Sequence, residues 1–152
     1  MEIQNDEVVS TLNNLIETCK DGQNGFQSAS EAVKDSELTG LFNKYSQQRG
    51  QFAAELQAEV RRLGGDPETT GSTAAAIHRG WIDIKSTVTG GDEAAIVAEC
   101  ERGEDSAVRN YEDALKENLP TNVQSVVRRQ FTEVKSAHDR IRSLEKANSA
   151  AK

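Results

Sequence analysis

The chain has 152 residues, enough for one domain with a substantial core but not for two independent domains. It is 36% hydrophobic and 28% charged, and its β-branched residues never gather into alternating runs, which argues against a β-sheet. The formal net charge of -7 argues against a nucleic-acid partner, because a duplex phosphate backbone would be repelled.

Neither a membrane span nor an export signal is expected from the sequence. No apolar run approaches the ~20 residues that a transmembrane helix needs. The start of the chain, from Met1 to Glu7, is acidic and polar where a signal peptide is basic and then apolar. The two cysteines, Cys19 and Cys100, form no CxxC motif, so reduced thiols are expected. We therefore expect a cytoplasmic protein without a membrane partner.

The first two predicted helices run from about Asp6 to Val33 and from about Glu37 to Leu63. Both carry apolar residues at helical spacing, with Asp6 as the N-cap of the first. Gly22 and Gly25 lower helix propensity by ~1 kcal/mol each, so we expect close packing or a kink there. The stripe of the second helix consists of Leu38, Leu41, Phe42, Tyr45, Arg49, Phe52, Leu56, Glu59, Val60 and Leu63.

The run Gly64 to Pro67 ends the second helix, because glycine leaves the helix and proline prevents its return. A shorter helix is predicted from Thr73 to about Val88, and two further long helices from about Glu93 to Glu117 and from about Asn122 to Ala147. Residues 148–152 are expected to fray.

The predicted order of elements is two long helices, a connection of about twenty-five residues and two more long helices. The connection is long enough to run back along a bundle. We therefore predict an all-α, ferritin-like up-down four-helix bundle, with a long crossover that carries a short fifth helix. A single domain would span residues 6–147 and would associate, as a dimer, through one face of the bundle.

One acidic residue interrupts the apolar stripe of the helix that follows the crossover. This stripe places Glu104 among Cys100, Ala107, Val108 and Tyr111. A buried carboxylate costs several kcal/mol unless it has a proton, a hydrogen bond, an opposite charge or a metal as its partner. Glu104 is therefore the first candidate for a functional position.

A weak internal repeat extends this position to all four long helices. When the two helix pairs are laid over one another, Cys19 falls opposite Glu104, and Glu59 falls opposite His138. Each of these residues lies on the core stripe of its helix. The sequence therefore predicts a polar layer of Cys19, Glu59, Glu104 and His138 in an otherwise apolar core.

Several motifs resemble an uncharacterised bacterial family, domain of unknown function 2383. They are Leu15 to Gly22 with Gly25-Phe26, the stretch Glu55 to Pro67, His78 to Trp81, and Arg102 to Asp105. The resemblance covers the chain from about Asp6 to Leu144. It implies a four-helix bundle of the ferritin-like superfamily, and it implies almost nothing about activity.

The chain departs from the ligand pattern of ferritin-like di-iron proteins, which use two Glu residues and two Glu-x-x-His motifs. Its two histidines are His78 and His138, and the residues three positions earlier are Ala75 and Lys135. A di-iron ferroxidase centre is therefore not expected. Glu59, Glu104 and His138, together with Glu55, could still hold one divalent ion such as iron or zinc.

Two functions remain open from the sequence. The first is a structural or interaction bundle of bacterial stress-type physiology, in which the acidic side chains are protonated or bonded to His138 and Tyr111 without a metal. The second is a divalent-metal-binding protein or oxidoreductase relative that uses Glu55, Glu59, Glu104 and His138. Cys19 is expected to serve as a small buried apolar residue. No set of residues supports nucleophilic catalysis.

Overall fold

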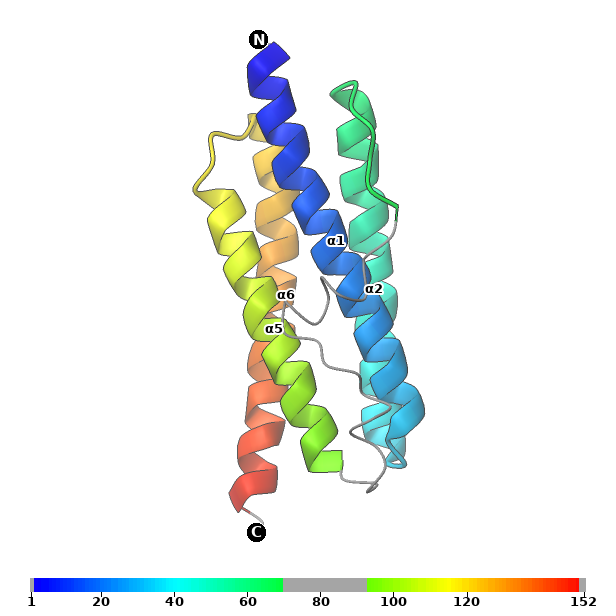
Figure 1. The fold of residues 1–152 in the computed structure, drawn as a ribbon. Helices are drawn as coiled ribbons and strands as arrows, with labels where there is room; N and C mark the ends of the chain where they lie inside the picture. Colours follow the sequence, from blue (N-terminus) through cyan, green and yellow to red (C-terminus); the bar gives the residue numbers. More distant parts are fainter. Residues whose placement is uncertain (1, 70–92, 151–152) are drawn as a thin grey trace.

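The computed structural model describes residues 2–69 and 93–150, which form four long α-helices and no strand (Figure 1). The four predicted long helices are confirmed. Their bounds are α1 Glu2–Ala32, α2 Ser36–Arg62, α5 Glu93–Leu115 and α6 Thr121–Ala150. Asp6 lies inside α1, so its predicted role as N-cap is wrong. The short helix predicted from Thr73 to Val88 falls outside the described residues.

The helices run in an order that requires a long crossover. In Figure 1, α2 rises to the top of the bundle and α5 begins at the bottom, so these two helices run parallel. The main packing is of α1 against α2, of α5 against α6, and of α1 against α5. This arrangement confirms the predicted four-helix bundle, in which α2 and α5 run parallel.

The turn between α1 and α2 is fixed by two carboxylates. The Asp35 side chain accepts a hydrogen bond of 2.8 Å from the backbone N–H of Glu37 and so caps α2. Glu93, the first residue of α5, accepts backbone hydrogen bonds from Lys34 at 2.8 Å and Asp35 at 3.0 Å. This end of the bundle therefore joins three helices through polar contacts.

The end of α2 follows the predicted glycine signal. Gly64 has φ +79°, a left-handed conformation that glycine adopts without strain, and Gly65 N–H returns to the carbonyl of Val60 at 3.0 Å. The chain then lies against α1, where Asn13 donates to the carbonyl of Asp66 and accepts from the N–H of Glu68. The first residues of the crossover are thus attached to the first helix.

The described residues form a core of two apolar clusters, one toward each end of the bundle. On α2, Phe52 belongs to one cluster and Tyr45 to the other; on α5, Ala107 and Cys100 are divided in the same way. The residues between them are therefore placed at the middle of the bundle. At this level the core becomes polar.

Candidate metal centre

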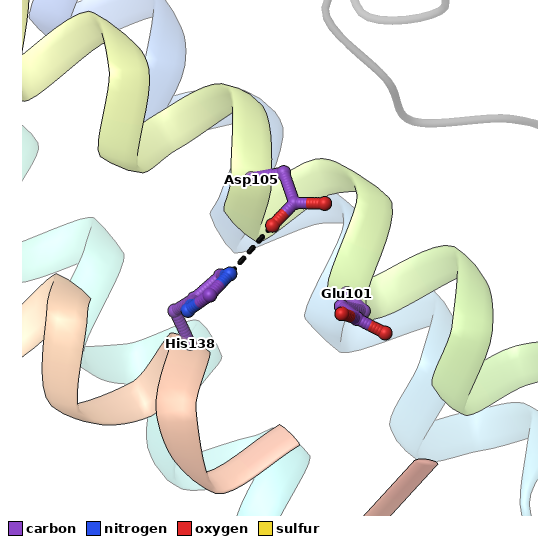
Figure 2. Close-up of side chains that lie close together, drawn as sticks. All are labelled: Glu101, Asp105 and His138. Atoms are coloured by element: carbon purple, nitrogen blue, oxygen red, sulfur yellow. Dashed lines mark hydrogen bonds and ion pairs between the residues drawn. The ribbon is translucent and has the colours of Figure 1, made fainter. Parts of the chain in front are cut away.

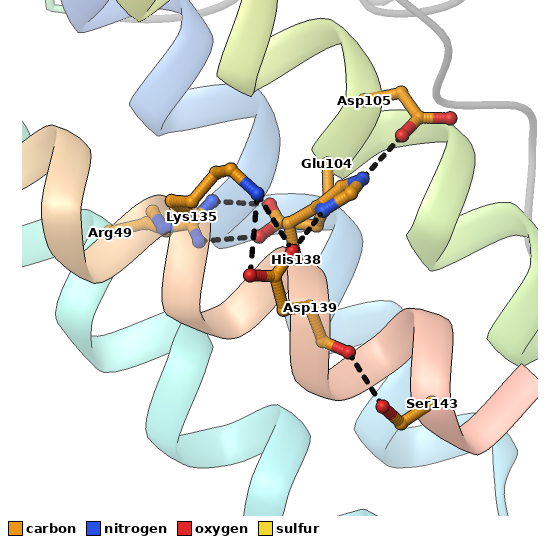
Figure 3. A network of polar contacts seen from close by, with 7 residues as sticks. All are labelled: Arg49, Glu104, Asp105, Lys135, His138, Asp139 and Ser143. Carbon is orange, nitrogen blue, oxygen red and sulfur yellow. Dashed lines mark hydrogen bonds and ion pairs between the residues drawn. The ribbon is translucent and has the colours of Figure 1, made fainter.

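A buried ion pair occupies the middle of the bundle. Arg49 of α2 donates two hydrogen bonds to Glu104 of α5, with Nη1–Oε1 at 2.5 Å and Nη2–Oε2 at 2.7 Å (Figure 3). The two side chains are 1% and 0% exposed. Burial alone would lower the pKa of Arg49, but the attraction of Glu104 and its hydrogen bonds raise that pKa above its usual value, so the guanidinium stays charged.

Arg49 packs closely against two residues of α1, Phe26 and Gly22. The guanidinium carbon lies 5.4 Å from the centre of the Phe26 ring, a cation–π distance. A Cβ atom at Gly22 would lie 3.3 Å from both Cγ and Nη1 of Arg49. The expected close packing at Gly22 is therefore confirmed, and the neighbour is this arginine.

A second buried polar chain contains Cys19. Its Sγ lies 3.1 Å from the hydroxyl of Tyr111, which donates to Oε1 of Gln130 at 2.8 Å. Burial raises the pKa of Cys19 from 9.0 to about 11, and the pKa of Tyr111 is raised well above 10.0 by the same cause. A protonated, buried thiol of this kind is a poor nucleophile.

Arginines also hold the other two acidic residues that the sequence marked as ligands. Glu59 is 6% exposed, and its Oε1 accepts from Arg62 at 2.6 Å, while its buried Oε2 accepts no hydrogen bond from the described residues. Glu55 forms an ion pair with Arg129 and also accepts from Gln130 Nε2 at 3.2 Å. Each of the three predicted carboxylates thus has an arginine partner.

His138 of α6 lies in a different polar contact. Its Nε2 is 2.5 Å from Oδ1 of Asp105, and its Nδ1 is 3.0 Å from Oδ1 of Asp139. The imidazole is 9% exposed, whereas the Asp105 side chain is 46% exposed. The ring therefore lies between α5 and α6 and points toward the surface of α5.

One group has the composition of a metal site. Glu101, Asp105 and His138 each offer a ligand atom, and these atoms lie within 4.8 Å of one another (Figure 2). No other set of three or more His, Cys, Asp or Glu in residues 2–69 and 93–150 meets this distance. Two carboxylates and one imidazole suit borderline ions such as Zn²⁺, Fe²⁺ or Mn²⁺.

The predicted polar layer is thus buried but does not form one cluster. Cys19, Glu59, Glu104 and His138 are all buried, as the helical stripes predicted. Glu104 binds Arg49 instead of His138 or Tyr111, because a guanidinium offers two parallel donors to a carboxylate. The role of Glu55, Glu59, Glu104 and His138 as ligands of one metal stays a prediction.

The sequence interpretation missed Arg49, Glu101 and Asp105. Arg49 lies on the apolar stripe of α2 between Tyr45 and Phe52, which was a signal for a buried cation opposite Glu104. Glu101 and Asp105 lie four residues apart, hence on one face of α5, but an acidic pair on a helix surface gives no sign of which side chain faces it.

The order of the four helices and the parallel course of α2 and α5 define a ferritin-like four-helix bundle. The structure is similar to that of a mutant of the Mycobacterium smegmatis Dps1 protein, with a TM-score of 0.80 and 16% sequence identity over 95% of this chain and 99% of that chain. The chain belongs to the family described as Domain of unknown function (DUF2383), whose sequence profile matches residues 7–117. The family resemblance drawn from the sequence motifs is thereby confirmed.

A second solved structure has the same fold within a larger protein. It is a two-domain protein from Anabaena variabilis that contains DJ-1/ThiJ/PfpI-like and ferritin-like domains, with a TM-score of 0.76 and 16% identity over 95% of this chain and 40% of that chain. A comparison with curated protein sequences gave no match. No helix in the described part of the chain is long and apolar enough to cross a membrane.

Proposed function

We propose that this protein is a structural or interaction bundle that has no ferroxidase centre in its core. The observation that carries the proposal is the ion pair of Arg49 and Glu104. Both oxygens of Glu104, the only fully buried carboxylate in residues 2–69 and 93–150, already accept hydrogen bonds from a cation. A divalent ion bound there would face the positive charge of Arg49 at close range, which disfavours it.

Oxidation of ferrous iron in air tests this proposal. We expect wild-type protein and a Glu104→Gln variant to leave the oxidation rate at that of a protein-free blank. A wild-type rate well above the blank that falls to the blank in Glu104→Gln would overturn the proposal. A Glu112→Gln variant, which changes an exposed acidic residue of α5, serves as the matched control.

The proposal includes self-association as a dimer in the cytoplasm. Light scattering after size-exclusion chromatography should give twice the chain mass of 16.6 kDa at micromolar concentration. A mass of one chain across the whole concentration range would remove the dimer from the proposal. The role of the core ion pair would be unaffected by that result.

A second candidate function, divalent-metal binding, is favoured by Glu101, Asp105 and His138. These residues supply three ligands from two adjacent helices and leave further coordination positions open, an arrangement that zinc sites with an open position share. A bound ion would take the Nε2 lone pair of His138, so the present hydrogen bond to Asp105 would give way to coordination. The three carboxylates predicted from the sequence each have an arginine partner, and this candidate site does not use them.

Calorimetric titration with Zn²⁺ tests the second candidate. We expect one ion per chain, and a loss of at least about tenfold in affinity for each of the variants Glu101→Gln, Asp105→Asn and His138→Gln. Glu112→Gln should bind as wild type does. Equal affinity in all four variants, or binding lost in Glu104→Gln with His138→Gln unaffected, would contradict this site.

A further inference from the structure

We infer that Asp139 is a positioning residue for His138 and holds the ring with Nε2 directed at Asp105 and Glu101. The inference rests on the second candidate function, divalent-metal binding, and states how that site would be held in place. Asp139 follows His138 directly on α6, and its Oδ1 lies 3.0 Å from Nδ1 of the ring. Both contacts of the imidazole are visible in Figure 3.

The chemistry of imidazole gives this contact its meaning. Both ring nitrogens lie beside a carboxylate, which accepts hydrogen bonds. When a metal ion takes Nε2 in place of the Asp105 contact, the proton stays on Nδ1, where Asp139 accepts it. A flip of the ring by half a turn would place carbon atoms where the two nitrogens now lie and break both contacts. Asp139 therefore selects the ring orientation and the nitrogen that faces α5.

Lys135 keeps Asp139 in place from one helical turn away. Its Nζ donates to Oδ1 of Asp139 at 3.0 Å and lies 3.3 Å from Oδ2. Lys135, His138 and Asp139 thus form a chain of contacts along α6, whereas the two carboxylate ligands come from α5. The orienting groups and the ligand carboxylates belong to different helices.

The exposure of Lys135 and Asp139 indicates that their contact positions His138 and adds little to folding stability. Lys135 and Asp139 have 48% and 57% of their side chains exposed. Ion pairs at such exposure add little to folding stability, because water screens them. Removal of Asp139 should therefore change the metal site far more than it changes the fold.

Zn²⁺ titration of Asp139 variants tests the inference. We expect Asp139→Asn and Asp139→Ala to bind Zn²⁺ about ten to one hundred times more weakly than wild type, with unchanged urea midpoints. Glu133→Gln, an exposed acidic change on α6, should keep wild-type affinity. Asp139 variants with wild-type affinity would overturn the inference and leave the site itself standing; a wild type that binds no zinc would overturn both.

The ring nitrogens give a second readout. The chain has two histidines, so a His78→Gln background leaves His138 as the single imidazole in a ¹H–¹⁵N spectrum. In zinc-loaded protein we expect metal at Nε2 and the proton at Nδ1, and a mixture of the two coordination modes in Asp139→Ala. Identical nitrogen signals in both proteins would contradict a positioning role.

Discussion

At the residue scale, Arg49 and Glu104 are bound to each other because neither can reach water. Replacement of either one leaves the other as an unpaired charge in an apolar environment, which costs about 3–5 kcal/mol. We expect Arg49→Met and Glu104→Leu each to lower the free energy of unfolding by this amount, measured by urea denaturation.

The double variant Arg49→Met/Glu104→Leu is the decisive comparison for this pair. It removes both charges and fills the space with apolar atoms. Its free energy of unfolding should therefore fall by less than that of either single variant. If the two single losses simply add in the double variant, the side chains are not coupled, and the ion pair is not what holds this layer together.

Gly22 gives a second prediction at the residue scale. Alanine raises helix propensity over glycine by about 1 kcal/mol, but at position 22 the new Cβ would press on an arginine that Glu104 holds in place. We expect Gly22→Ala to bring no gain in thermal stability, and Gly40→Ala, where the exposed helix has nothing within 4 Å, to gain about 1 kcal/mol. Equal gains at the two positions would contradict the close packing.

At this scale the sequence allowed us to predict which polar side chains are buried, but not which partners they bind. Helical spacing placed Glu59, Glu104 and His138 inside, and all three are buried. Their partners depend on the rotation and height of neighbouring helices, which one-dimensional spacing does not contain. The Asp105–His138 contact shows this clearly, because Asp105 follows Glu104 directly and yet reaches a different helix.

At the element scale, the turn between α1 and α2 depends on the side chain of Asp35. Its Oδ1 accepts a hydrogen bond from the backbone N–H of Glu37, one of the N–H groups at the start of α2 that have no partner within the helix. Asp35→Ala should lower the free energy of unfolding by about 1 kcal/mol, whereas Asp35→Asn should stay near wild type. Equal losses in the two variants would point to the charge of Asp35 rather than to its hydrogen bond.

The existence of the four long helices followed from apolar periodicity, and their ends were harder to predict. Apolar stripes mark the part of a helix that packs, so the polar start from Glu2 to Asn5 gave no signal that α1 extends through it. The strongest ends were those with a stereochemical cause. Gly64, with its positive φ, stops α2 where the sequence predicted.

At the scale of the whole molecule, the order of helices sufficed to predict the bundle. A connection of about twenty-five residues between two helix pairs leaves few topologies, and the parallel α2 and α5 agree with the one predicted. The burial of Glu104 could be predicted from its helical stripe, and this residue lies between the two apolar clusters. Its chemistry could not, because it depends on which charges meet.

The buried thiols and tyrosine make the stability of the whole bundle sensitive to alkali. Burial raises the pKa of Cys19 to about 11 and raises those of Cys100 and Tyr111 well above 9.0 and 10.0. At about pH 7 these groups are neutral in both states and leave stability unchanged, and ionisation of the unfolded thiols begins about one pH unit below their pKa of 9.0. Above pH 9 the unfolded chain loses protons that the folded protein keeps, so stability falls.

We therefore expect the free energy of unfolding to be level up to about pH 8 and to fall with increasing slope as the pH rises through about 9. Each thiol that ionises only in the unfolded state contributes a slope of about 1.4 kcal/mol per pH unit. Urea denaturation at a series of pH values measures this slope, and Cys100→Ala should reduce it, because one of the titrating groups is gone. Cys100 is buried and cannot lose its proton in the folded state without placing a charge in the core, so it should contribute to the slope. If Cys100→Ala left the slope unchanged, the loss of stability in alkali would have to come from other groups.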